Sequence, residues 1–261
     1  MISWRALLRW PLPRAGEQDG QPTHKKRKKN LPGEVNDAVN LELEVIFIAI
    51  PKTGTTTVRN QIAPPPPYLV PFPHLNILQV RDSLYLHFLM KALNKNRRFP
   101  TKAVLSDADV RALALATFQN FFKFSSVRNP WARAVSLYFR NEGVKVSQRV
   151  SFEEFCDRHL FASDTCLNPT LHRNQIDWIT DETGAIAVDY FYKIEEFEKR
   201  IPEIRERSGG RLDLRPLQSN VNLRSTSRTY PDLYNDRTRK LIGTRFEKDI
   251  DTFGYTFGAP S

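Results

Sequence analysis

The chain has 261 residues, of which 40% are hydrophobic and 26% charged, a composition that supplies a buried core and excludes a wholly disordered protein. Its formal net charge of +10 indicates an acidic partner, which nucleic acid, anionic lipid, a polyphosphorylated cofactor and an acidic polysaccharide would all satisfy. The longest apolar run, 45–50, is too short to cross a bilayer, so we expect no membrane span.

Residues 1–40 are predicted to be a basic, flexible N-terminal extension that precedes a single domain over 41–261. The basic run at 24–29 is interpreted as a solvated tail, with a nucleic-acid or membrane-surface patch as the alternative. The first ten residues are too short for a signal peptide. Cys156 and Cys166 make neither a disulfide framework nor a metal-ligand spacing, and whether they pair is left open. Together these features favour a cytoplasmic protein.

In the first half of the domain, an apolar run at 43–50 predicts a strand that is buried on both faces. Four successive prolines at 64–67 predict a stiff, extended connector. Ser106 is the expected N-cap of a helix whose first turn holds Asp107 and Asp109. We expect helices over 56–62, 75–93 and 106–118, with a basic loop over 94–101.

In the second half, buried strands are expected over 121–127 and 185–192. Ser151 and Glu154 have the spacing of a capping box, which predicts a helix over 151–159. Further helices are expected over 129–141, 195–208 and 236–246. Because strands alternate with helices, the fold is predicted to be α/β, with a central parallel sheet flanked by helices.

The segment after the first strand has the features of a phosphate-binding loop. Gly54 allows the backbone to approach an anion, and the helix that follows directs its free N–H groups at one spot. Lys52 precedes this glycine, whereas a Walker A motif places its lysine after the second glycine. The residues expected to bind phosphate here are Lys52, Thr53, Gly54, Thr55, Thr56 and Thr57.

The segment after the second strand predicts a second anion site. Arg128 ends the strand at the edge of the sheet where ligands dock, and its planar guanidinium suits a phosphate. Asn129 and Pro130 predict the start of a helix, on which Ser136 adds a hydroxyl. On that helix we expect Trp131, Val135 and Tyr138 to share one buried face. Arg133, Ser136 and Arg140 are expected on another face.

These two segments resemble the sulfotransferase superfamily, most closely the carbohydrate sulfotransferases of the family 2 type. The resemblance is carried by Pro51–Thr56 and by the stretch from Val127 to Arg133, and it includes the spacing between Arg128 and Ser136. Weaker similarity extends it over about 43–258, through Val188–Tyr190, Ile194–Glu195, Asn222–Ser225, Tyr234, Asp236–Ile242, Asp249–Ile250 and Phe253–Tyr255.

The resemblance implies a P-loop-like core and a donor, 3′-phosphoadenosine 5′-phosphosulfate, that is held without a metal. It implies that the first loop binds the 5′-phosphosulfate, that Arg128 and Ser136 bind the 3′-phosphate, and that Lys52 steadies the leaving phosphate. The acceptor would be a hydroxyl, most simply on a carbohydrate. With no membrane anchor expected, the resemblance favours a soluble member of bacterial type.

The resemblance also implies a catalytic histidine between the two motifs, where the chain has His74 and His87. A histidine is the natural base for in-line displacement near neutral pH. We favour His74, because it follows the proline-rich connector at the junction of a loop and a helix. His87 lies in the middle of a predicted helix, and His172 is a candidate for contact with the acceptor.

Two other functions remain open from the sequence. A basic nucleic-acid-binding protein would explain the charge, although the chain lacks zinc-finger, RRM and KH signatures and no nucleic-acid partner is expected. A nucleotide kinase with an atypical phosphate loop would require Mg²⁺ and a carboxylate to hold it. The acceptor and the oligomeric state are not determined by the sequence.

Overall fold

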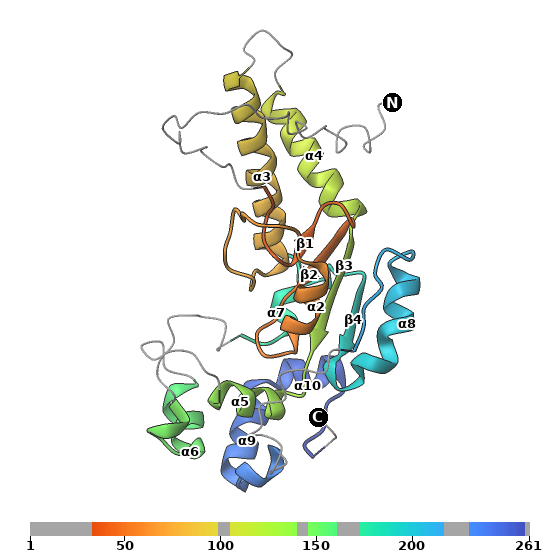
Figure 1. Ribbon diagram of the computed structural model, residues 1–261. Coiled ribbons are helices and arrows are strands. Elements are labelled where there is room, and N and C mark those ends of the chain that lie inside the picture. Colours follow the sequence, from red (N-terminus) through yellow and green to blue (C-terminus); the bar gives the residue numbers. More distant parts are fainter. Residues whose placement is uncertain (1–32, 99–104, 140–145, 161–172, 217–229, 259–261) are drawn as a thin grey trace, which may run out of the picture.

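A computed structural model describes residues 33–98, 105–139, 146–160, 173–216 and 230–258. Its centre is a four-stranded sheet with the strand order β1-β2-β3-β4 (Figure 1). Strands β2 (Val45–Ile48), β3 (Phe122–Val127) and β4 (Tyr190–Lys193) run parallel, and β1 (Val39–Asn40) pairs antiparallel with β2. The predicted α/β fold with a central parallel sheet is confirmed, and β1 is an addition that the sequence did not predict.

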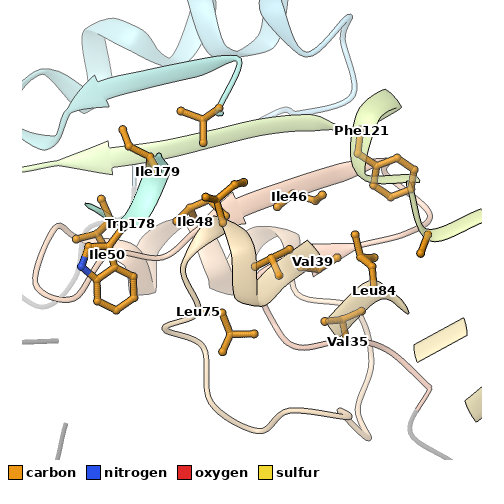
Figure 2. Close-up of a cluster of buried hydrophobic side chains, with 14 of the residues drawn as sticks. Val35, Val39, Ile46, Ile48, Ile50, Leu75, Leu84, Phe121, Trp178 and Ile179 are labelled. Carbon is orange, nitrogen blue, oxygen red and sulfur yellow. The ribbon is translucent and has the colours of Figure 1, made fainter. Parts of the chain in front are cut away.

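Helices cover both faces of the sheet, because the strands bury side chains on both. Ile46 and Ile48 of β2 pack into a cluster with α3 (Ile77–Arg98) and α4 (Asp107–Asn120), part of which Figure 2 shows. Val45 and Phe47 point into the cluster on the opposite face, with α2 (Thr55–Ile62) and α8 (Phe197–Arg207). Successive side chains of a strand point to opposite faces of the sheet, so the continuous apolar run of β2 packs against helices on both faces.

Helices α3 and α4 lie side by side and project beyond the sheet (Figure 1). The capping box of α4 is present, because Ser106 accepts from the Asp109 N–H and Asp109 accepts from the Ser106 N–H. The predicted basic loop over 94–101 is wrong in its first part, since α3 continues to Arg98. The lysine and arginines at 95–98 have good helix propensity, which the predicted loop did not take into account.

A third apolar cluster lies around α5 (Pro130–Tyr138), which starts immediately after β3. It includes α6 (Phe152–Glu154), a π-helical turn (Phe155–His159) and α9 (Asp236–Arg245), so the single helix expected over 151–159 is divided. Ser151 accepts from the Glu154 N–H as predicted. Helix α10 (Glu247–Phe253) was not predicted from the sequence. The remaining helical segments in the described residues are short: Val146–Gln148, Ile176–Ile179 (α7), Ile194–Glu196 and Tyr230–Leu233.

The predicted strand over 185–192 is wrong at its beginning, because β4 covers only Tyr190–Lys193. Asp181 accepts hydrogen bonds from the N–H groups of Thr183 and Ala185, which holds this segment in a turn. The N–H of Ala187 then donates to the Ile179 carbonyl instead of to a strand of the sheet. Local side-chain hydrogen bonds and a bridge between Thr180 and Ile186 therefore replace pairing with β3 before residue 189.

The folded core begins upstream of residue 41, where the boundary of the domain was expected. Val35, Ala38 and Val39 are buried. The backbone at 33–35 exchanges hydrogen bonds with the backbone at 67–70, directly after the prolines. Residues 33–40 are thus part of the domain, while the basic run at 24–29 lies outside the described residues.

Candidate functional site

Three loops meet at the carboxyl edge of the parallel sheet. They follow β2, β3 and β4 and lead into α2, α5 and α8. Since the three strands are parallel neighbours, their loops emerge at the same edge, which is where open α/β sheets bind ligands. Helices α5 and α10 lie beyond this edge in Figure 1.

The first loop, Ile50–Gly54, contains two residues in the left-handed region of backbone conformation. Gly54 has a φ of 76° and Lys52 a φ of 69°. For Lys52 this conformation costs about 1–2 kcal/mol, because the Cβ atom approaches the following carbonyl. A Cβ atom on Gly54 would lie 2.5 Å from Cδ1 of Ile194, just after β4, so any other residue would require Ile194 to move and would adopt the left-handed conformation at a cost. Strain of this kind is a mark of binding sites.

Helix α2, like α8, begins without a side-chain cap, whereas several other helices have one. Asn129 caps α5, Ser106 caps α4 and Asn235 caps α9. At α2 the N-cap is Gly54, no side chain bonds to it, and no acidic residue lies in its first turn. The amino end of α2 therefore keeps N–H groups that can bind an anion. Thr55 is buried, Thr57 is half-buried and Thr56 is exposed there.

Arg128 of the second loop reaches the first loop. Its Nη1 donates to the carbonyl of Lys52 at 3.4 Å, across 76 positions of the chain. Arg128 is half-buried, and desolvation of its guanidinium lowers its pKa. Across the described ranges Arg128 makes no ion pair with a carboxylate, whereas Arg200 and Arg237 each make two. A desolvated cation that makes no close ion pair within the described residues, and whose charge is favoured at longer range by Glu195, thus lies against the first loop.

Further contacts tie the first two loops together. The Ser126 hydroxyl lies 2.9 Å from both the carbonyl and the hydroxyl of Thr53. Arg133 of α5 donates from Nε to the Pro51 carbonyl at 3.1 Å. Burial lowers the pKa of Arg133 to about 10, so the group remains charged at neutral pH.

The predicted buried face of α5 is confirmed for Trp131, Val135 and Tyr138. Arg133, which was expected on another face, is also buried, with 1% of its surface exposed. It is accommodated because its guanidinium hydrogen-bonds to backbone carbonyls. Arg140 lies outside the described residues.

The third loop supports the second. Glu195, next to Ile194, accepts from the Asn129 N–H at 2.8 Å. Its other oxygen accepts from the Tyr255 hydroxyl at 3.3 Å, and Asn129 also donates to the Thr256 carbonyl at 2.9 Å. The sequence indicated Glu195 and Tyr255 only as part of the family resemblance. No local pattern predicts the contact between their side chains.

The structure separates the histidine candidates. Nδ1 of His74 lies 2.7 Å from the carbonyl of Ala49, between β2 and the first loop. His87 is 2% exposed in α3, and burial, with a smaller contribution from Lys91, lowers its pKa to about 3. His172 lies outside the described residues. Of the two described histidines, His74 is the one that contacts the segment leading into the first loop.

Ser136 is half-buried on α5, about two helical turns beyond Arg128. In the described part of the chain its hydroxyl makes no hydrogen bond, and no contact joins it to Arg128 or to the first loop. Its binding role therefore stays a prediction from spacing.

Other features lie away from this edge. A hollow of about 350 Å³ opens at the amino ends of β3 and β4, near Phe122, Asp189 and Arg207. Cys156 is buried, which raises the pKa of its thiol to about 12, and Cys166 is outside the described residues. Within the described ranges, no helix is long and apolar enough to cross a membrane, and no three His, Cys, Asp or Glu side chains form a group that could hold a metal ion.

Comparison with known proteins agrees with the motifs. A model of the sulfotransferase family matches residues 38–256, which include the sheet and all three loops. No curated protein and no solved structure matches the chain significantly. The chain therefore belongs to the sulfotransferase family, whose members transfer sulfuryl groups.

Proposed function

We propose that the protein transfers a sulfuryl group from 3′-phosphoadenosine 5′-phosphosulfate to a hydroxyl of a carbohydrate, by in-line displacement and without a metal. The observation that carries the proposal is the position of Arg128. Its guanidinium lies against the Lys52 carbonyl, which brings the two predicted phosphate sites to one edge of the sheet. One ligand with phosphates at both ends is what such a pair of sites would bind.

The donor's two ends have different partners in this proposal. The first loop, with its left-handed backbone and the uncapped amino end of α2, binds the 5′-phosphosulfate through backbone N–H groups and Lys52. This is the P-loop-like part of the fold. Arg128, with Ser136, binds the 3′-phosphate, for which a desolvated guanidinium provides a strong, charge-assisted hydrogen bond.

His74 is the proposed base. When its Nδ1–H donates to the Ala49 carbonyl, Nε2 carries the lone pair that accepts the proton of the acceptor hydroxyl. The acceptor oxygen then bonds to sulfur while the bond from sulfur to the bridging phosphate oxygen breaks. Lys52 stabilises the negative charge that grows on that phosphate. The products are a sulfate ester and adenosine 3′,5′-bisphosphate, with the proton on His74.

The carbohydrate acceptor is supported by the resemblance of the two loops, and the basic character of the chain suits an anionic glycan. The expected cytoplasmic location rests on the sequence and stays a prediction.

Two measurements test the proposal. Titration calorimetry should detect binding of adenosine 3′,5′-bisphosphate by the full chain in the presence of a chelator. Labelled donor, mixed with a panel of glycans, should transfer label to at least one of them. Absence of bisphosphate binding would remove the proposal, and loss of activity on chelation would favour the kinase alternative.

The nucleic-acid alternative predicts polyanion binding that weakens steeply with salt. Deletion of residues 1–32 tests it better than deletion of 1–40, because 33–40 belong to the core. If the shortened chain keeps nucleotide binding and loses polyanion binding, the basic tail is separate from the function of the domain.

A further inference from the structure

Gln175 makes a two-point contact with the backbone of Arg128, although neither phosphate motif contains it. Its Oε1 accepts from the Arg128 N–H at 2.8 Å, and its Nε2 donates to the Arg128 carbonyl at 2.8 Å. Residue 128 is the first after β3, where the ladder with β4 has ended. The side-chain amide therefore satisfies both backbone groups of Arg128 at the point where the sheet no longer does so.

Asp249 of α10 fixes the orientation of this amide. One carboxylate oxygen accepts from the Gln175 N–H at 2.8 Å and from its Nε2 at 3.3 Å, and the other accepts from the Ile176 N–H at 3.0 Å. Gln175 and Asp249 are both 0% exposed. Because a carboxylate only accepts hydrogen bonds, the nitrogen end of the amide faces Asp249 and its oxygen end faces the Arg128 N–H.

The same buried group reaches the first loop through Arg133. Nη1 of Arg133 donates to the carbonyl of Arg173 at 3.2 Å, and Arg173 lies two residues before Gln175. Nε of Arg133 donates to the Pro51 carbonyl of the first loop. The charge of Arg133 also opposes the rise that burial causes in the pKa of Asp249, which favours the ionised carboxylate. Four segments that are distant in sequence are thus joined behind the two anion sites.

We propose that Gln175, oriented by Asp249, is a positioning residue for the donor's 3′-phosphate. It holds the backbone of Arg128 so that the guanidinium stays directed toward the first loop. The inference rests on the proposed function, since it assumes that Arg128 binds the 3′-phosphate. It adds a requirement that the motifs do not contain: recognition of that phosphate depends on an amide nearly fifty residues away.

The test compares two nucleotides that differ only in the 3′-phosphate. Affinities for adenosine 3′,5′-bisphosphate and adenosine 5′-monophosphate are measured by calorimetry on the full chain and on Gln175→Met, which keeps the volume and loses both hydrogen bonds. We expect the variant to bind the bisphosphate about tenfold more weakly and the monophosphate as well as the original chain does. Gln175→Asn, whose amide is too short to reach the Arg128 backbone, should behave in the same way.

A double-mutant cycle separates positioning from general support of the fold. In an Arg128→Ala background, Gln175→Met should cause no further loss of bisphosphate affinity, because the group that it positions is absent. Equal losses for both nucleotides, or additive losses in the cycle, would overturn the proposal. So would failure of both Gln175 variants to fold in thermal unfolding measurements.

The original chain serves as the control for the premise. If it does not prefer the bisphosphate to the monophosphate, the proposed function fails. If it has that preference and the Gln175 variants keep it, only the positioning role fails.

Discussion

The first and second loops follow neighbouring parallel strands and lead into helices, yet they are built in opposite ways. The first contains left-handed residues at Lys52 and Gly54, and its helix has no side-chain cap. The second has its helix capped by Asn129, and the backbone of Arg128 is bonded on both sides by Gln175. One loop leaves backbone donors available to an anion, while the other uses its backbone within the protein and presents a side-chain cation.

The difference shows that two predicted anion sites on one sheet edge can depend on different features of the chain. The first loop should be sensitive to backbone conformation and to any added Cβ atom. The second should be sensitive to the side chain of Arg128 and to the groups that hold it. Substitutions at each site therefore test whether the two loops differ in this way.

His74→Ala should have the largest effect, because His74 is the proposed base beside the first loop. Turnover should fall about 10²- to 10⁴-fold, the contribution typical of a general base. Affinity for adenosine 3′,5′-bisphosphate should be nearly unchanged, since the imidazole acts on the acceptor. His87→Leu is the matched control, and it should retain full turnover. Undiminished turnover in His74→Ala would mean that another group is the base.

Lys52→Ala should lower turnover about 10²- to 10³-fold, because it removes a cation from the leaving phosphate. Lys52→Gly removes the same charge and also relieves the left-handed strain, so it should unfold at a higher temperature than Lys52→Ala. Steady-state kinetics and thermal unfolding of the two variants separate the side chain from the backbone. An active Lys52→Gly would show that the loop needs only its backbone.

Arg128→Ala should weaken binding of adenosine 3′,5′-bisphosphate about 10- to 100-fold, as expected for loss of a charged hydrogen bond. Turnover at saturating donor should change little, because the 3′-phosphate is remote from sulfur. Arg128→Lys keeps the charge without the planar fork and should lose less affinity. Calorimetry checks both variants, with adenosine 5′-monophosphate as the control ligand. A loss of the same size for both ligands would place Arg128 elsewhere in the site.

Gly54→Ala should lower the free energy of unfolding by about 1–2 kcal/mol through its left-handed backbone alone, and by more because the new Cβ atom meets Ile194. In an Ile194→Ala background the collision is absent and only the backbone cost remains, so Gly54→Ala should destabilise that background less than it destabilises the original chain. Urea unfolding measures both differences. If they are equal, the side chain of Ile194 yields without cost.

The smallest expected effect concerns His87 and pH. Its folded pKa of about 3 lies below the ordinary histidine pKa of 6.5, so between these values only the unfolded chain takes up the proton. His87 should therefore lower stability by about 1 kcal/mol between pH 8 and pH 6, a loss that His87→Leu should not show. Urea unfolding at the two pH values tests this. An equal pH dependence in both proteins would mean that His87 is accessible to protons.

Much of the fold was readable from local pattern. The apolar runs predicted β2 and β3, Ser106 marked the start of α4, and Asn129 with Pro130 marked the start of α5. The predictions of secondary structure were wrong where long-range or competing contacts determine whether a strand forms. The start of β4 depends on the turn that Asp181 holds, and β1 exists because it pairs with β2.

For the site, the sequence by itself determined where the two loops lie and which family they resemble, because glycine, lysine and arginine directly after apolar strands form local patterns. Phosphate binding by these loops stays a prediction. Only the tertiary structure decided which groups meet: Arg128 with the Lys52 carbonyl, His74 with Ala49, and Gln175 with Asp249. These contacts join residues 25 to 76 positions apart. No local pattern specifies such pairs, since they form when packing of the helices against the sheet brings separate segments to one edge.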